Sequence, residues 1–144
     1  MSEIDWKPDL IVASYHGIPK KYFDKGDPYH CYCQKTTRLL TEHIRINIPI
    51  ITTFQSRFGP EEWLKPYTDE TIDNLPKEGK KKIFVICPGF ASDCVETLEE
   101  ISIEAKESFI ENGGEKFLTV PCLNYNKEHI DLLEYLVKKY LIRR

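Results

Sequence analysis

The stretch "LIVASYHGIP", residues 10–19, decides the fold of this chain. It begins with a continuous apolar run and then places Tyr15 and His16 directly before a glycine and a nearby proline. Three more short, β-rich runs follow along the chain: "IPIITTF" (48–54), "KIFVIC" (82–87) and "KFLTVP" (116–121). Strands that are apolar on both sides are typical of parallel sheets whose two faces are both covered.

Segments with helical signals separate the apolar runs. We expect helices over about 28–46, 68–75, 92–112 and 127–141, the first of them starting at Pro28 or His30. Ser92 and Asp93 are good N-cap residues for the third helix, and "NGG" at 112–114 supplies glycines that end it. The last helix should turn four apolar side chains inward: Leu132, Leu133, Leu136 and Val137. The pattern predicts an α/β fold, with one domain over 1–144 and a four-stranded parallel sheet covered by helices on both faces.

Composition narrows the class of protein. With 144 residues, of which 41% are hydrophobic and 30% charged, the chain is long enough for one compact domain with its own core. The formal charge of −3 is not that of a general polyanion binder, so we expect no nucleic-acid partner. No apolar run reaches the roughly 18–20 residues that span a bilayer, and the start, "MSEIDWKPD", lacks the apolar centre of a signal peptide. We therefore expect a cytoplasmic protein with at most peripheral membrane contact.

The cysteines do not form the pattern of a secreted disulfide framework, because their number is odd and their spacing irregular. They are Cys31, Cys33, Cys87, Cys94 and Cys122. The tripeptide "CYC" at 31–33 could belong to a metal site, but zinc and iron–sulfur sites usually need two spaced pairs or a run of four. We favour the interpretation of these thiols as small apolar side chains.

His16 is the first candidate site residue. Ligands of open parallel sheets bind beyond the carboxyl ends of the strands, and His16 stands where the first strand ends. Histidine changes its protonation near neutral pH, so it can serve there as a base or as a metal ligand. The alternative is a polar loop residue that hydrogen-bonds the backbone.

An acidic stripe follows the third strand. At helical spacing, five carboxylates fall on one side of the helix: Asp93, Glu96, Glu100, Glu104 and Glu107. The other side should carry Val95, Leu98, Ile101, Ala105 and Phe109. For Glu104 and Glu107 we favour a solvated outer face. Glu96 lies in the first turn, at the sheet edge that also holds His16, where the two would suit a divalent metal or a pair of proton acceptors.

The long connection "FQSRFGPEEWLKPYTDE", residues 54–70, gathers aromatic side chains around glycine and proline. The aromatic residues are Phe54, Phe58, Trp63 and Tyr67. Such a segment could form a wall for a flat apolar ligand, with Arg57 or Lys65 reaching acidic substituents. It could equally be a loop that its own aromatic cluster holds in place.

Four stretches of the chain resemble the C-terminal half of a ferrochelatase. They are "SYHGIPKKYFDKGDPY", "TFQSRFGPEEWLKPYTDE", "ICPGFASDCVETLEEI" and "VPCLN", in the order of that family and over nearly the whole chain, from about Trp6 to Val137. The resemblance implies a Rossmann-like, chelatase-type domain. It also implies a lyase that inserts ferrous iron into a porphyrin, protoporphyrin IX in the last step of haem biosynthesis.

The resemblance also implies roles for single residues. His16, from "HGIP", and Glu96, from "ETLEE", would be the metal ligands and proton acceptors. Asp93 and Glu100 would relay protons or guide the metal. The implied porphyrin-binding residues are Tyr15, Ser56, Arg57 and Trp63. Cys94 stands where some members carry a second histidine. Iron is substrate, no organic cofactor is implied, and we expect no iron–sulfur cluster, because the chain ends at Arg144 without the cysteine-bearing extension of some members.

A complete ferrochelatase has two halves of this kind, and the resemblance covers only the second. The implied partner is therefore a missing N-terminal half or a second copy of the chain. Two alternatives remain open: a non-catalytic half-domain that binds porphyrin or metal, and a small homodimeric chelatase for another metal and tetrapyrrole. The second alternative predicts a basic pocket, which the aromatic 54–67 segment does not favour.

Overall fold

The computed structural model describes residues 4–141, so the expected domain limits at 1–3 and 142–144 lie outside the described residues. The strands are β1 (Leu10–His16), β2 (Ile50–Gln55), β3 (Lys82–Ile86) and β4 (Lys116–Thr119). The helices are α1 (Lys20–Asp24), α2 (Tyr29–Ile44), α3 (Thr68–Asn74), α4 (Val95–Leu98), the π-helix η1 (Glu100–Ala105), α5 (Lys106–Glu111) and α6 (Lys127–Leu141). The short helix α1 is the element that the sequence pattern did not predict.

The sheet is the predicted one, with four parallel strands in the order β2-β1-β3-β4. Strand β1 lies between β2 and β3, and Val12 pairs with Ile51 on one side and Val85 on the other. Val12 and Ala13 are fully buried, as a central strand covered on both faces requires. The expectation of an apolar, doubly covered parallel sheet is therefore confirmed.

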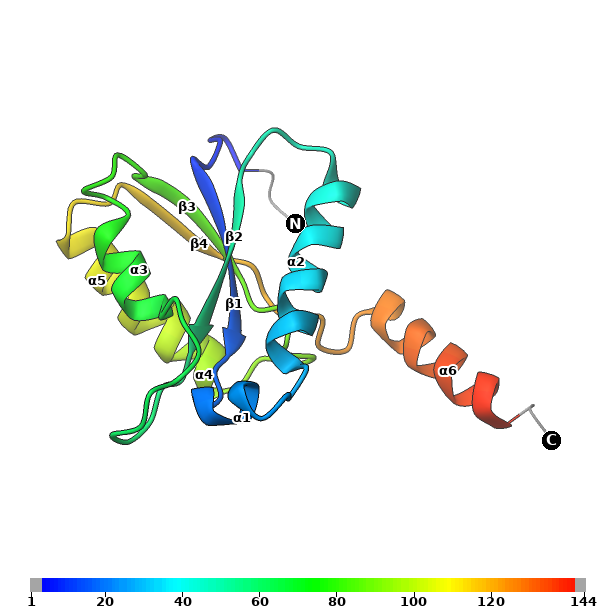
Figure 1. Cartoon of the computed structure of the whole chain (residues 1–144). Helices are drawn as coiled ribbons and strands as arrows, with labels where there is room; N and C mark the ends of the chain where they lie inside the picture. Colours follow the sequence, from blue (N-terminus) through cyan, green and yellow to red (C-terminus); the bar gives the residue numbers. More distant parts are fainter. Residues whose placement is uncertain (1–3, 142–144) are drawn as a thin grey trace.

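Helices cover both faces of this sheet (Figure 1). Helix α2 lies against one face, whereas α3, η1 and α5 lie together on the other. Phe109 of α5 is fully buried, and a Cβ atom at Gly114 would come within 2.1 Å of its ring. The glycine after α5 therefore lets the chain turn tightly against the core before β4 begins.

The third predicted helix is present but is not a continuous α-helix. Its N-cap is Cys94, not Ser92 or Asp93, and its middle is the π-helix η1. Val95 and Leu98, predicted on the side opposite the acidic stripe, are 67% and 53% exposed and do not belong to the core, unlike Ile101 and Phe109. A π-helix has more residues per turn than an α-helix, so one period of 3.6 residues cannot place both ends of this segment.

Helix α6 has the predicted bounds, but its predicted inward face is wrong. Leu132, Leu133, Leu136 and Val137 are between 40% and 58% exposed. Figure 1 shows α6 extending away from the sheet, beyond α2. An amphipathic pattern shows that one side of a helix is apolar, but not which surface covers it.

Within residues 4–141, no helix combines the length and apolar character needed to cross a bilayer.

Candidate functional site

His16 ends β1 with its ring held in a defined orientation. Its Nδ1 lies 2.7 Å from the carbonyl oxygen of Gly17. A carbonyl can only accept, so Nδ1 carries a proton, and in the neutral form of the ring the lone pair is on Nε2. The Tyr29 hydroxyl donates to the His16 carbonyl at 2.8 Å, and burial raises the pKa of Tyr29, which keeps that donor protonated. Backbone and ring are thus both fixed.

Two aromatic rings flank His16. The ring centroids of Trp63 and Phe90 lie 6.3 and 6.2 Å from that of the imidazole. Gly17 makes the Trp63 position possible, because a Cβ atom there would come within 2.9 Å of the indole ring. The predicted aromatic wall therefore reaches the edge through Trp63, whereas Phe54 is 1% exposed and belongs to the core.

Glu96 lies at the start of α4, beside His16. The Cys94 thiol is the main cause that holds the pKa of Glu96 below its ordinary value; the Glu96 backbone N–H adds to it, and so does His16 when it is protonated. Cys94 and Thr97 also cap the helix reciprocally, since each side chain bonds the backbone of the other. Glu96 therefore lies close enough to His16 for their charges to interact.

Glu100 is not a solvated member of the acidic stripe. The Ser56 backbone N–H and hydroxyl donate to its two carboxylate oxygens at 2.6 and 2.7 Å. Ser56 has a φ of 63°, in the left-handed region, which is uncommon for a residue other than glycine and aims both donors at one carboxylate. Glu104 and Glu107 are exposed, as predicted.

Gln55 is the site residue that sequence reasoning missed. It is 2% exposed, and its Nε2 donates to the Glu96 carbonyl at 2.7 Å and to the Glu100 carboxylate at 3.2 Å. Its Oε1 accepts from the Ser14 hydroxyl at 2.8 Å, and its carbonyl accepts from the Gly17 N–H at 2.8 Å. Gln55 thus ties β1 and β2 to the helix that carries both carboxylates. The available signal was a long amide side chain at the end of an otherwise apolar strand.

Asp93 holds the loop after β4. Its carboxylate accepts from the Asn124 side chain at 2.7 Å, from the Cys122 N–H at 3.2 Å and from the Thr97 hydroxyl at 3.1 Å. These bonds, that of Asn124 above all, lower the pKa of Asp93. Both oxygens are engaged within the protein, so the relay role of Asp93 stays a prediction.

We expect Asn124→Gly to raise the pKa of Asp93 toward its ordinary value. Glycine tolerates the φ of 49° at this position, so the substitution removes the amide and keeps the turn. A carboxyl whose folded pKa is lowered contributes stability above its unfolded pKa, and this contribution disappears as the pH falls through the folded pKa. The variant should therefore be less stable at neutral pH and should lose less on acidification. NMR titration of Asp93 and urea unfolding between pH 2 and 7 measure both; an unchanged titration curve would contradict the assignment.

The structure does not bring two predicted porphyrin contacts to the edge. Tyr15 is 3% exposed, and its hydroxyl shares a hydrogen bond of 3.0 Å with Thr37 of α2. The Arg57 guanidinium lies 4.1 Å from the Tyr67 ring centroid and pairs with Asp69 and Glu70 of α3. The porphyrin contacts of Tyr15 and Arg57 therefore stay predictions.

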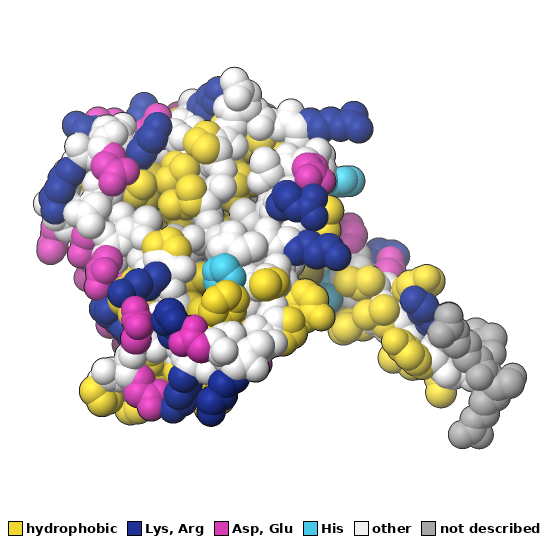
Figure 2. Space-filling model, viewed as in Figure 1, with side chains coloured by type: hydrophobic (Ala, Val, Ile, Leu, Met, Phe, Trp, Pro, Cys, Tyr) yellow, Lys and Arg dark blue, Asp and Glu magenta, His cyan; other side chains and the backbone are white. Residues whose placement is uncertain are grey.

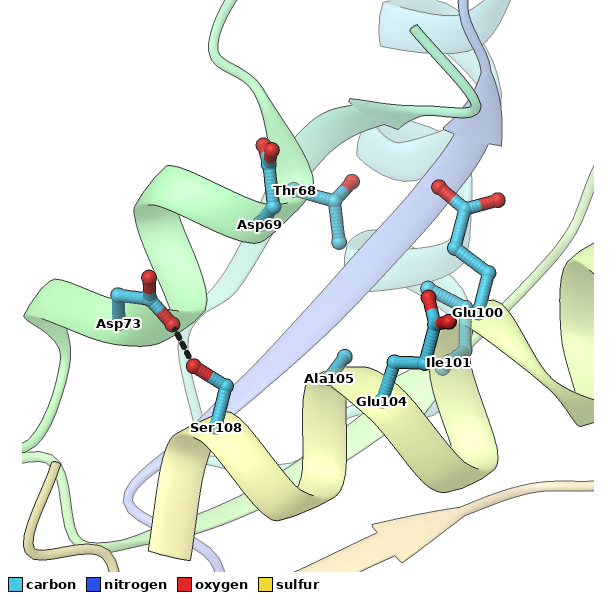
Figure 3. A pocket seen from close by; sticks show the side chains of 8 residues that line it. All are labelled: Thr68, Asp69, Asp73, Glu100, Ile101, Glu104, Ala105 and Ser108. Carbon is cyan, nitrogen blue, oxygen red and sulfur yellow. Dashed lines mark hydrogen bonds between the residues drawn. The ribbon is translucent and has the colours of Figure 1, made fainter. Parts of the chain in front are cut away.

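A pocket of about 230 Å³ opens between α3 and the helix that carries Glu100. Figure 3 shows its lining: Thr68, Asp69, Asp73, Glu100, Ile101, Glu104, Ala105 and Ser108. Ser108 donates to Asp73 across the pocket, so the two helices are joined at its far end.

Within residues 4–141, no three or more His, Cys, Asp or Glu side chains are grouped closely enough to hold a metal ion. His16 and Glu96 can thus supply only part of a coordination shell.

The five cysteines are free thiols, and the interpretation as small apolar side chains holds for the buried Cys33 and Cys87 but not for Cys31. Cys31 is exposed and Cys33 buried, since residues two apart on a helix point in different directions. This arrangement does not favour a "CYC" metal pair. Burial raises the pKa of Cys87 and of Cys122 to about 12, so both remain thiols at neutral pH.

We expect iodoacetamide at pH 7.5 to label Cys31 first and to leave Cys33, Cys87 and Cys122 unmodified in the folded protein. The thiolate is the nucleophile, and these three side chains combine burial with a raised pKa. Peptide mass spectrometry, with a urea-unfolded sample as control, gives the order of labelling. Rapid labelling of Cys87 would show that the base of the site opens to solvent.

The sequence of this chain is similar to those of known proteins. The ferrochelatase family model matches residues 2–141. The ferrochelatase of Rhizobium etli is 56% identical over 98% of this chain, that of Rhizobium meliloti 57% over 98%, and that of Brucella ovis 52% over 99%. The chain spans only 41–42% of the length of these relatives.

A solved structure has the same fold. A putative cobalamin biosynthesis CbiX protein from Marinobacter aquaeolei superposes with a TM-score of 0.58 at 15% identity, over 95% of this chain and 100% of that one. At this identity the likeness concerns the fold alone. The family match covers nearly every residue, including the His16 and Glu96 motifs, and the chain therefore belongs to the ferrochelatase family.

Proposed function

We propose that this chain carries the metal-handling half of a ferrochelatase site, which inserts ferrous iron into a porphyrin. The observation that carries the proposal is the convergence of His16 and Glu96 at the carboxyl edge of the sheet. His16 offers a free Nε2 lone pair, and Glu96 is a carboxylate whose pKa is lowered. Imidazole and carboxylate together suit Fe²⁺ as substrate.

The arrangement also suits the proton chemistry of metallation. A free-base porphyrin must lose two pyrrole protons as the metal enters, and His16 Nε2 and the Glu96 carboxylate are two candidate acceptors at the same edge of the sheet. Trp63 and Phe90 offer ring surfaces beside His16 against which a flat macrocycle could lie. Binding energy gained there can be used to bend the macrocycle toward the geometry of the transition state. The proposal needs no organic cofactor.

The proposal includes a partner, because the chain spans 41% of the Rhizobium etli relative. A cleft has two walls, and the described residues supply one of them. The other would come from an N-terminal half or from a second copy of the chain. We also propose a cytoplasmic setting, supported by five cysteines without a disulfide, with peripheral membrane contact at most.

An anaerobic metallation assay tests the proposed function. The chain is incubated with Fe²⁺ and protoporphyrin IX or coproporphyrin III, alone and after co-expression with the part of the Rhizobium etli ferrochelatase that lies outside the matched region. Haem formation is followed by absorbance, and the mass in solution is measured on the same samples. Metallation by either sample supports the proposal. Porphyrin or metal binding without metallation in both would favour the non-catalytic half-domain.

A further inference from the structure

We propose that the exposed apolar side of α6 is the docking surface for the polypeptide that longer members of the family carry beyond the matched region. This inference rests on the proposed function, since it names the surface that would receive the missing wall. We call this side of the helix the α6 face; it consists of Ile130, Leu133, Leu136, Val137, Tyr140 and Leu141.

The α6 face is a continuous apolar stripe. Its residues recur at helical spacing, and each is between 40% and 73% exposed. Figure 2 shows hydrophobic side chains, in yellow, along the projecting helix. On the opposite side, charged side chains one turn apart form ion pairs with each other: Lys127 with Asp131, and Glu134 with Lys138. The apolar side of α6 is therefore largely uncovered by the rest of residues 4–141.

Beyond its first turn, α6 receives little support from the rest of the described chain. None of the principal packing contacts between elements of residues 4–141 involves it. A helix of 15 residues is marginal in water by itself, and most helical stability in proteins comes from packing of an amphipathic face. A covering surface would supply that packing.

The start of α6 is fixed relative to the site. His129 is 9% exposed, and its Nδ1 donates to the Asn124 carbonyl at 2.6 Å. The Asn124 side chain in turn bonds Asp93, next to the cap of α4. A partner on the α6 face would therefore be held in a set position relative to the helix that carries Glu96.

A second apolar surface lies beside the loop that leads into α6. A groove of about 260 Å³ lies between α2 and the loops after β3 and β4, and its apolar lining includes Leu40, Phe90, Val120 and Leu123. Phe90 belongs both to this groove and to the pair of rings that flank His16. A partner that covers the α6 face and the groove would thus reach the edge of the site.

The comparisons favour the rest of the family's chain over a second copy. The family match runs to residue 141 and therefore includes all of α6, so this helix belongs to the family's conserved length and is not an added tail. In the relatives the same stretch occurs within a polypeptide more than twice as long. The exposed apolar helix of this chain is therefore matched, in the relatives, by additional polypeptide that could cover it.

The test is co-expression of the tagged chain with the part of the Rhizobium etli ferrochelatase outside the matched region. The wild type should retain that polypeptide, as judged by size exclusion with light scattering. Leu133→Lys combined with Val137→Lys should weaken the complex at least tenfold, because two desolvated contacts become charges. Tyr135→Lys is the matched control: it makes the same kind of change on the opposite side of α6, at a residue that is 61% exposed, and should retain the complex.

Each other result would overturn the inference. The inference fails if the wild type forms no complex, or if the double variant retains it unchanged. A homodimer that the double variant dissociates would assign the α6 face to a second copy. The variants leave His16 and Glu96 untouched, so Co²⁺ binding by the chain, measured by absorbance with His16→Ala as blank, tests the metal site independently of docking.

Discussion

Replacement of His16 by alanine is expected to abolish metallation in any assembly of this chain that shows it. The imidazole offers the free Nε2 at the site, and Glu96 alone is a weaker ligand and a poorer base near neutral pH. Loss of a positioned general base or acid typically lowers the rate by about 10²–10⁴-fold. Metal affinity should fall together with the rate, because the same nitrogen serves both steps.

The fold should survive this substitution. The His16 side chain makes one recorded hydrogen bond, to the neighbouring Gly17 carbonyl, and the residue is only half-buried. We expect a loss of about 1 kcal/mol in the free energy of unfolding. His43→Ala is the matched control, since His43 is exposed near the far end of α2.

Glu96→Gln keeps the shape of the side chain and removes its charge, and it should weaken Co²⁺ binding less than His16→Ala does. Wild-type turnover in His16→Ala would remove the residue from the mechanism.

The convergence of His16 and Glu96 could be predicted because it follows from topology. Parallel strands bring their carboxyl ends to one edge, so a histidine at the end of β1 and a carboxylate at the start of the helix after β3 have to lie near each other. The four apolar runs predicted the strands, because a strand that is covered on both faces shows no alternation of apolar and polar side chains.

The roles of Glu100 and Ser56 depend on geometry that spacing does not contain. Ser56 reaches Glu100 only because its backbone is left-handed, and Glu100 begins a π-helix where an α-helix was expected. Both features are local departures from the regular periods on which sequence reasoning rests. Departures of this kind are found most often at functional sites.

The orientation of α6 could not be predicted for a different reason. Its apolar stripe is plain in the sequence, and the expected inward face assumed that the sheet would cover it. The structure leaves that expected face uncovered, at between 40% and 58% exposure. A periodic pattern reports the need for burial, whereas the identity of the covering surface depends on chain outside the pattern.

Replacement of Gln55 by leucine is expected to give the largest loss of stability. The side chain is 2% exposed and bonds the Ser14 hydroxyl, the Glu96 carbonyl and the Glu100 carboxylate. Leucine fills a similar volume but satisfies none of these groups. In the variant, Ser14 still has Thr68 as a hydrogen-bond partner, and Glu100 still has Ser56. Most of the lost stability therefore comes from the Glu96 carbonyl, which loses its donor, and from the weaker binding of the Glu100 carboxylate. We expect a loss of about 3 kcal/mol, measured by urea unfolding.

Gln34→Leu is the matched control for this change. Gln34 is exposed on α2, where its one recorded contact is a 3.5 Å approach to His30, and the same substitution there should alter stability by less than about 0.5 kcal/mol. Equal effects of the two variants would mean that the buried amide does not hold the site together.

Gln55→Glu removes the Nε2 donor of the side chain but keeps its length and shape, which Gln55→Leu does not. It keeps the size of the side chain but places a second carboxyl group against Glu100, and this raises the folded-state pKa of the pair. A carboxyl group whose folded pKa is raised costs stability above its unfolded pKa, and the cost decreases as the pH falls through the folded pKa. The variant should therefore be less stable than the wild type at pH 7 and should recover part of the difference at pH 5. Gln55→Leu, which adds no charge, should show no such recovery. If both variants followed the same pH dependence, the Gln55 amide would not be the group that faces Glu100 in solution.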